Sequence, residues 1–328
     1  MFLFSAFVVP RSALDRMSRT RSFEEAKPQL MPTVRTTERY FFMTDIIRAD
    51  TAGFCMGVDL ALRELDKVVA EQGGPVFTLG PIIHNPQVLE AYAEKGVRIA
   101  KGVEEIVPGA RVVIRAHGIP VDLEKQLLAQ GAVVVDATCP KVKRAQRLIQ
   151  RHTAQGELLL LLGEHDHPEV RGLLSYANQK AHMFEGLSDI NPSDLDPSSQ
   201  YFLAAQTTQD RGEFNKIVEY LRLHLERTLP VLDTICDATR ERQQEALTLA
   251  ENVDLVVVVG GYNSGNTRRL AQVVQGVGVD SLHIEQAGEL PADRIKAAQN
   301  IGLTAGASTP KELIDDVHRR LLELRKGC

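Results

Sequence analysis

The feature that most constrains this chain is an internal repeat, in which a short aliphatic run ends in a cysteine and an amphipathic segment follows. Cys55, Cys139 and Cys236 each stand at such a transition. Aliphatic runs such as VVVVG and LLLLLG alternate along the chain with amphipathic segments such as VDLEKQLLAQG and KELIDDVHRRLLEL. Runs of this length predict buried parallel strands covered by helices. The sequence therefore predicts an α/β protein, and the valine run before Cys139 is read as a buried strand.

Polar residues recur at two further strand ends behind each cysteine, at nearly constant spacing. The two sets are His84, His167 and Asn266, and then His117, Thr207 and Ser308. Ligands of open α/β sheets bind beyond the carboxyl ends of the strands. Three copies of one unit that face a shared centre therefore predict a single site.

The repeat also predicts the domain organisation. We expect three α/β domains, each a small, mostly parallel sheet flanked by helices, at 57–139, at 140–232, and at 44–56 together with 233–328. Residues 1–43 are expected to form a disordered extension, with Met43 as an alternative start. A processed targeting segment is the other interpretation of that extension.

Composition excludes several classes of protein. The net charge of -5 argues against a general nucleic-acid binder, and no apolar run approaches the roughly 20 residues that cross a bilayer. The 4 cysteines form no C-x-x-C pair, which argues against a zinc ribbon or a disulfide framework. We expect a cytoplasmic protein in a reducing compartment, with neither nucleic acid nor membrane as a partner.

Three equivalent cysteines suit an iron–sulfur cluster. The amino end of a helix lowers the pKa of a thiol and favours the thiolate. Such a cluster normally has four protein ligands, so three leave one iron open to substrate. The alternative for any single cysteine is a small buried residue, but three repeated positions argue against it. Cys328 lies outside the pattern and is expected to be a tail thiol.

Several loops that open helices carry uncharged hydrogen-bond donors. Such helix starts bind phosphate, and the absence of a Walker loop or G-x-G-x-x-G motif disfavours a nucleotide. A small phosphorylated or diphosphorylated substrate fits better, although each donor alone can be a plain helix cap. These candidate residues are His84, His117, Ser264, Asn266 and Ser308.

The segment GEHDHPEVRG places His167 and Glu169 together at a strand end. A carboxyl whose pKa is raised in a dry pocket is a candidate proton donor, and the hydroxyls of Thr207 and Thr208 can relay a proton or cap the next helix. The rival interpretation is a metal site formed by His165, Asp166 and His167.

One helix carries a concentration of basic residues, in the segment KVKRAQRLIQRH. An acidic electron donor can dock on such a face, but an exposed basic face without a partner is the more common meaning. The residues concerned are Lys141, Lys143, Arg144, Arg147 and Arg151.

From Met43 onward the motifs GFCMGV, IIHNPQV, AHGIP, DATCP, HPEVRG, AQTT, ICDATRERQ, NSGNTRRL and TAGAS resemble those of the LytB, or 4-hydroxy-3-methylbut-2-enyl diphosphate reductase, family. The resemblance implies a three-lobed trefoil with pseudo-threefold symmetry around a central 4Fe-4S cluster. It also implies reductive dehydroxylation of the allylic diphosphate to isopentenyl and dimethylallyl diphosphate, the last step of the methylerythritol phosphate route. The expected partners are this substrate and an electron donor such as ferredoxin or flavodoxin.

The resemblance further implies roles for individual residues. Cys55, Cys139 and Cys236 hold the cluster, Glu169 supplies protons with His167 beside it, and Thr207 contacts the substrate hydroxyl. One departure from the family pattern is Gly265, where many relatives carry serine, which implies one diphosphate donor fewer. The implied diphosphate site comprises His84, His117, His167, Thr207, Ser264, Gly265, Asn266 and Ser308.

Two other functional classes are consistent with parts of the sequence. A metal-dependent hydrolase of phosphorylated compounds would use His165 and His167, and would contain zinc or manganese but no sulfide. A non-catalytic iron–sulfur carrier or sensor would need a fourth ligand and would not need the histidine, serine and asparagine donors.

Overall fold

The computed structural model describes residues 46–71, 73–177, 181–225 and 228–326. Residues Met43–Cys328 form one compact unit. Within the described part, the strands form three separate sheets, and every strand pair is parallel. The expectations for residues 1–43 and for Cys328 lie outside the described residues.

The first lobe is built on the sheet with strand order β3-β2-β4-β5. Helices α1 and α2 pack on one face of this sheet, and α3 packs on the other with a short 3-10 turn, Val103–Glu105. The strands are β2 (Val76–Leu79), β3 (Arg98–Ala100), β4 (Arg111–Ile114) and β5 (Val133–Asp136), and the helices are α1 (Met56–Ala70), α2 (Pro86–Glu94) and α3 (Val121–Ala129).

The second lobe has the sheet order β7-β6-β8, enclosed by α4 and α5 on one face and α6 on the other. The chain continues past α6 to Val231, which forms a parallel bridge with Leu203 of β8. The strands are β6 (Leu158–Leu162), β7 (Ala181–Phe184) and β8 (Tyr201–Ala205), and the helices are α4 (Pro140–Ala154), α5 (Pro168–Ser175) and α6 (Arg211–His224).

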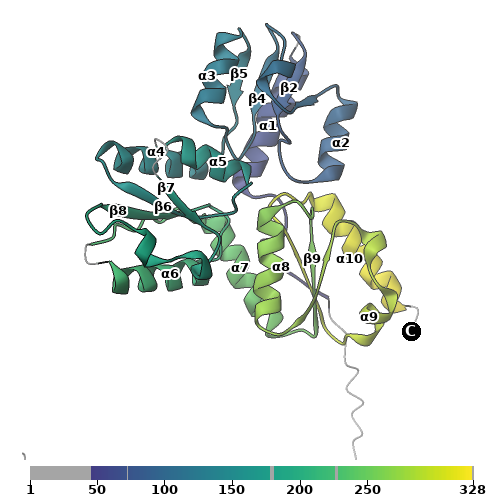
Figure 1. The fold of residues 1–328 in the computed structure, drawn as a ribbon. Coiled ribbons are helices and arrows are strands. Elements are labelled where there is room, and N and C mark those ends of the chain that lie inside the picture. Colours follow the sequence, from purple (N-terminus) through teal and green to yellow (C-terminus); the bar gives the residue numbers. More distant parts are fainter. Residues whose placement is uncertain (1–45, 72, 178–180, 226–227, 327–328) are drawn as a thin grey trace, which may run out of the picture. The chain divides into compact units, whose positions relative to one another are not determined.

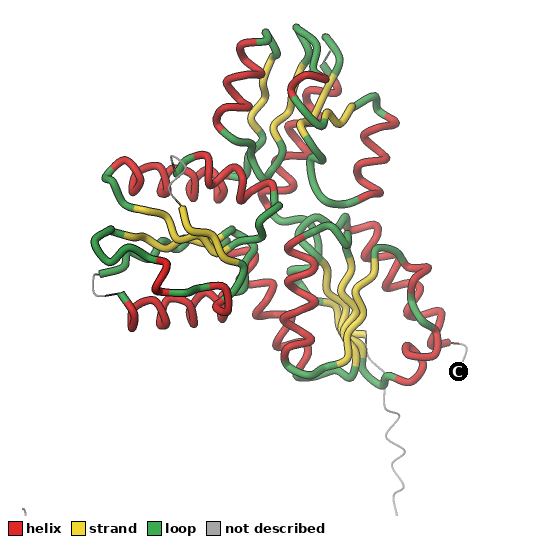
Figure 2. The backbone as a smooth tube through the Cα atoms, viewed as in Figure 1, coloured by secondary structure: helices red, strands yellow, loops and turns green. Residues whose placement is uncertain are grey.

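The third lobe has the sheet order β1-β11-β9-β10, with α7 and α8 on one face and α9 and α10 on the other. Figure 2 shows the strands of this lobe between two layers of helices. The strands are β1 (Ile46–Arg48), β9 (Leu255–Val259), β10 (Asp280–Ile284) and β11 (Ile301–Ala305), and the helices are α7 (Asp237–Ala250), α8 (Gly265–Gly276), α9 (Ala292–Ala297) and α10 (Lys311–Lys326).

The three lobes repeat one topology, as the spacing of the cysteines predicted. In each, the strand that leads to a cysteine lies at a sheet edge: β5 beside β4, Val231 beside β8, and β1 beside β11. The helix after the cysteine then packs on the next lobe, because α1 contacts the first sheet, α4 the second and α7 the third. Each cysteine is therefore the point where the chain crosses between lobes. Figure 1 shows the three lobes that these crossings join.

One expectation about the strands was wrong. The valines before Cys139 form β5, which is an edge strand in which Val133 is 56% exposed, not a strand buried on both faces. Among the described strands only β4 pairs with it, so its other edge has no strand beside it there. The runs around 158–162 and 255–259 are the buried central strands β6 and β9, as predicted. The domain boundaries at 57–139, 140–232 and 44–56 plus 233–328 stay a prediction.

Candidate functional site

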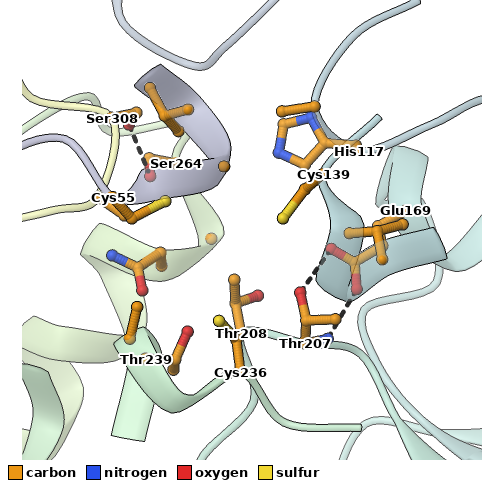
Figure 3. A pocket seen from close by; sticks show the side chains of 18 of the residues that line it. Cys55, His117, Cys139, Glu169, Thr207, Thr208, Cys236, Thr239, Ser264 and Ser308 are labelled. Atoms are coloured by element: carbon orange, nitrogen blue, oxygen red, sulfur yellow. Dashed lines mark hydrogen bonds between the residues drawn. The ribbon is translucent and has the colours of Figure 1, made fainter. Parts of the chain in front are cut away.

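A pocket of about 710 Å³ lies where the three lobes meet, and its walls come from all three (Figure 3). Every residue proposed from the sequence as a cluster ligand, proton donor or substrate contact lines this pocket: Cys55, His84, His117, Cys139, His167, Glu169, Thr207, Cys236, Ser264, Gly265, Asn266 and Ser308.

The three cysteines occupy equivalent positions at the starts of α1, α4 and α7. Each is the N-cap residue, yet none of their side chains caps its helix. Their backbone N–H groups donate to the carbonyls of Ala307, Ala116 and Thr207, respectively, at 3.1, 3.0 and 2.9 Å. These bonds hold each cysteine beside the carboxyl end of a strand, β11, β4 and β8, respectively. The half-buried thiols form no disulfide and stay free to face the pocket.

The helix starts approach one another closely at this point. A Cβ atom built on Gly57 would lie only 2.4 Å from Sγ of Cys139, so no larger residue fits at the first turn of α1. Figure 3 shows the sulfur atoms of Cys55 and Cys139 directed into the same space, with Cys236 below them. Three soft ligands around one cavity can hold a metal centre.

The expected lowering of the thiol pKa was wrong for two of the three cysteines. Burial raises the pKa of Cys139 and of Cys236, although N–H groups at the start of each helix act in the opposite direction. The neighbouring thiols raise the pKa further. Without a metal these two thiols are therefore protonated, and metal binding must displace their protons.

Three imidazole rings form a second cluster on the wall of the pocket. The ring centres of His84 and His117 are 5.0 Å apart, those of His117 and His167 5.2 Å, and those of His84 and His167 6.0 Å. Burial lowers the pKa of His84 to about 4 and that of His167 to about 3, and moves that of His117 far below its ordinary value. All three rings are neutral at pH 7.

Several polar atoms of this wall are buried without a hydrogen-bond partner. They are Nε2 of His84, Nδ1 of His117 and Nδ2 of Asn266. Buried polar atoms are almost always paired in native proteins, so unpaired ones that line a pocket point to a polar ligand. Ser308 Oγ lies 3.3 Å from Ser264 Oγ and adds hydroxyls to the same wall.

Glu169 lies beside Thr207 on the wall of the pocket (Figure 3) and is 1% exposed. Its carboxylate accepts hydrogen bonds from the N–H group of Thr207 at 2.7 Å and from the Thr207 hydroxyl at 2.9 Å. Burial raises the pKa of Glu169 to about 7, although both bonds from Thr207 act to lower it and the charge of Glu164 raises it. Near neutral pH this carboxyl can therefore both hold and release a proton.

His167 connects the imidazole cluster to Glu169. It is the N-cap of α5, and its Nδ1 accepts a hydrogen bond from the N–H group of Glu169 at 3.1 Å. This bond requires an unprotonated Nδ1, so the proton of the neutral ring is on Nε2. The bond to Nδ1 therefore fixes the orientation of the ring and leaves its Nε2–H group as a hydrogen-bond donor.

The predicted site omitted Arg242, which lines the pocket beside the cysteines and is 4% exposed. Its guanidinium donates to the carbonyls of Thr51 at 2.5 Å and Gly53 at 2.8 Å, in the segment before Cys55. Nothing in the charged segment DATRERQ distinguishes this arginine from the exposed Arg240, because only tertiary packing buries it.

The rival metal site has a different composition in the structure. His165 is on the surface, where its Nδ1 lies 3.1 Å from Glu185 Oε1 and its side chain is 62% exposed. Within the described residues, the group around His167 whose ligand atoms can share one ion consists of His84, His117 and His167, all within 4.8 Å. The hydrolase hypothesis thus loses His165 and Asp166 as ligands.

The basic helix α4 is partly neutralised within the chain. Lys141 pairs with Asp237 at 2.5 Å and Lys143 with Asp136 at 2.6 Å. Arg144 donates to the Asp233 carbonyl at 2.9 Å. A face on which two cations are already paired attracts an acidic partner less strongly, and docking of an electron donor on α4 stays a prediction.

Comparison with known proteins gives consistent results. Residues 46–322 match the model of the LytB protein family. The chain is 59% identical over 279 residues to a 4-hydroxy-3-methylbut-2-enyl diphosphate reductase of Nitratidesulfovibrio vulgaris strain Miyazaki F, covering 85% of this chain and 99% of that one. It is 40% identical over 288 residues to the reductase of the same name from Aquifex aeolicus, covering 87% and 98%.

Solved structures show the same similarity. One is an (E)-4-hydroxy-3-methyl-but-2-enyl diphosphate reductase described as the terminal enzyme of the non-mevalonate pathway, with a TM-score of 0.63, 40% identity, and coverage of 86% of this chain and all of that one. A Plasmodium falciparum reductase has the same fold, with a TM-score of 0.77, 24% identity, and coverage of 84% and 86%. No helix among the described residues is both long and apolar enough to span a membrane.

Proposed function

Because this chain belongs to the LytB protein family, we propose that it is a 4-hydroxy-3-methylbut-2-enyl diphosphate reductase. It would convert the allylic diphosphate to isopentenyl and dimethylallyl diphosphate in the last step of the methylerythritol phosphate route. The observation that carries this proposal is the convergence of three uncapped thiols, a buried carboxyl and unpaired polar nitrogens on one pocket.

The donor set fits an iron–sulfur cluster. Cys55, Cys139 and Cys236 are the three described cysteines, and all three line the pocket without capping their helices. A 4Fe-4S cluster held by them would supply single electrons and would have one iron without a protein ligand. Arg242 ties the segment before Cys55 to α7 and so keeps two of the ligands at a fixed separation.

The wall of imidazoles and hydroxyls would bind the diphosphate. His84 Nε2, His117 Nδ1 and Asn266 Nδ2 lack partners, and phosphate oxygens would accept hydrogen bonds from them where they carry a proton. Ser264 and Ser308 add hydroxyl donors, and Ser264 also caps α8, so the phosphate would lie near a helix start. Binding the diphosphate here directs the other end of the substrate toward the thiols and Glu169.

Glu169 and Thr207 would supply protons. Removal of the hydroxyl group consumes two electrons and two protons, one leaving with the oxygen as water and one ending on carbon. With a pKa of about 7, Glu169 carries a proton in a large fraction of molecules at neutral pH. The Thr207 hydroxyl bonds to the carboxylate and also lines the pocket, so it can position the substrate hydroxyl and pass a proton to it.

The electrons come from a separate protein, for which we propose a ferredoxin or flavodoxin. Two cations of α4 are paired with carboxylates of the same chain, so α4 alone does not define the surface on which this donor docks. Location in the cytoplasm stays a prediction.

A metal-dependent hydrolase is the second candidate, because His84, His117 and His167 can share one ion. Neutral imidazoles are the form that binds zinc. That function leaves three thiols in the same pocket without a role. Metal content separates the candidates: the reductase contains iron and acid-labile sulfide, whereas the hydrolase contains zinc or manganese.

The test is an anaerobic assay of the purified chain with a chemically reduced dye and 4-hydroxy-3-methylbut-2-enyl diphosphate, followed by product analysis. We expect both isoprenoid diphosphates, and iron and sulfide that Cys139→Ser removes but Cys328→Ser does not. Colourless protein with bound zinc and no reduction would reject the proposal.

A further inference from the structure

Arg115 is a buried cation without a carboxylate partner among the described residues. It follows strand β4, is 8% exposed, and forms no ion pair there. The hydrogen bond recorded for it runs from Nε to the Gly118 carbonyl at 3.4 Å, which is long. Burying a charge without a counter-ion costs free energy of folding, which indicates that an anion balances this arginine in the functional state.

The guanidinium lies directly behind two of the imidazole loops. A Cβ atom on Gly80 would be only 2.4 Å from Nη1 of Arg115, and Gly80, whose φ is +74°, opens the loop that carries His84. On its other side, Gly118 follows His117 in the chain. The charge is therefore held between the backbone segments that present the two rings.

Electrostatics places the same charge within reach of the pocket. After burial, the positive charge of Arg115 contributes to the lowered pKa of all three rings, His84, His117 and His167. Arg115 itself has a pKa lowered to about 10, first by burial and then by the cation Arg171, with no acidic group acting on it. It faces neutral rings and another cation.

The proposed diphosphate wall lacks a free positive charge. Its imidazoles are neutral, and its serine and asparagine donors carry none. The cation Arg268 reaches toward this wall, but it is paired with Glu164 at 2.5 Å. A diphosphate carries several negative charges, and transferring it into a half-enclosed pocket of neutral donors is unfavourable unless a cation balances it.

We propose that Arg115 is a positioning residue for the diphosphate, whose charge is balanced only when that anion lies against the imidazoles in front of it. This inference rests on the proposed function and adds a residue to it. The charge acts through His84 and His117, because Arg115 does not line the pocket. The ligand-free protein therefore bears an electrostatic cost that the anion removes on binding, which makes the pocket selective for anionic substrates.

The test measures binding of inorganic pyrophosphate to the cluster-loaded protein by anaerobic calorimetry, for the wild type, Arg115→Met and Arg115→Lys. We expect the methionine variant to bind about tenfold more weakly, the usual scale for losing one charged partner. The lysine variant, which keeps the charge, should stay within about threefold of the wild type. Arg319→Met, which removes an exposed charge on α10, is the control for net charge.

The melting temperature of the ligand-free protein separates this role from a purely structural one. If Arg115 only stabilised the fold, Arg115→Met would melt at a lower temperature than the wild type. Because removing an unbalanced buried charge relieves strain, Arg115→Met should melt no lower than the wild type, and pyrophosphate should stabilise it less. A KM that rises about tenfold with kcat nearly unchanged would agree, since uniform binding is lost.

Three results would overturn the inference. One is an unchanged affinity in Arg115→Met, and another is an equal loss in Arg115→Met and Arg115→Lys, which would attribute the effect to shape. The third is an Arg115→Met chain that fails to fold without anion. Pyrophosphate binding is measured without turnover, so this test is independent of the reductase assay. A chain without reductase activity can still support the role of Arg115, and a chain with reductase activity can still reject it.

Discussion

The N–H group and the hydroxyl of Thr207 both donate to the carboxylate of Glu169, at 2.7 and 2.9 Å. Both bonds favour the charged carboxylate, and yet burial outweighs them and raises the pKa of Glu169 to about 7. The site thus holds a carboxyl near the midpoint of its titration at neutral pH, oriented by a hydroxyl that also faces the pocket.

Replacing Glu169 by glutamine should leave the pocket intact but remove the proton. We expect kcat to fall by about 10²- to 10⁴-fold, the range for losing a general acid, with iron and sulfide content unchanged. The measurement is steady-state reduction of the allylic diphosphate beside metal analysis. Glu219→Gln, on the exposed side of α6, is the matched control and should retain full activity. Full turnover in Glu169→Gln would place the acid elsewhere.

The dependence of kcat on pH should report the titration of Glu169. Since the protonated form is the active one, kcat should decline as pH rises through about 7. The Thr207 hydroxyl lowers this pKa, so Thr207→Val should raise it and move the declining limb to higher pH, whatever it does to the maximum rate. Thr208→Val leaves the bonds to Glu169 in place and serves as the comparison. A limb that moves to lower pH in Thr207→Val would contradict this assignment.

Arg242→Met should weaken both the fold and the cysteine site. It leaves the carbonyls of Thr51 and Gly53 without donors, which should lower the free energy of unfolding by about 2–4 kcal/mol. Loss of the tether to the segment before Cys55 should also reduce iron retention. Arg240→Met, two residues earlier in α7 and exposed, should do neither. Denaturant unfolding and iron analysis of both variants decide the matter, and equal behaviour of the two would refute a tethering role.

Gly265 and Glu164 compete for space at the rim of the pocket. A Cβ atom on Gly265 would lie 3.2 Å from Glu164 Oε1, whose carboxylate is held by Arg268. We expect Gly265→Ser alone to raise KM about threefold, because the carboxylate must shift. Combining it with Glu164→Ala should lower KM below that of Glu164→Ala alone, since the added hydroxyl can then reach the diphosphate. Additive effects in this double-mutant cycle would show that the two positions are independent.

Much of this architecture could be predicted from the sequence, because the repeat carries the information. The buried runs that form β6 and β9 and the strand-to-helix position of each cysteine follow from local pattern. The return of the first strand to the last sheet was also predicted, and β1 does pair with β11. The LytB resemblance was confirmed by the family match and by near-full-length relatives.

What could not be predicted depends on packing. The solvent exposure of β5 follows from its place at a sheet edge, which a run of valines does not reveal. The raised pKa values of Cys139 and Cys236 arise from burial and from the proximity of thiols distant in sequence. Arg115 and Arg242 look like ordinary charged residues in the sequence, and only the fold places one behind the imidazoles and the other beside the thiols.

Because each cysteine marks a crossing from the edge of one lobe to a helix packed on the next, a metal centre held by all three would join the three crossings at one point. Extraction of that metal would remove the link between all three crossings at once and so loosen the packing of the lobes against one another. Damage to such a metal centre would therefore affect the packing of all three lobes as well as the chemistry of the pocket.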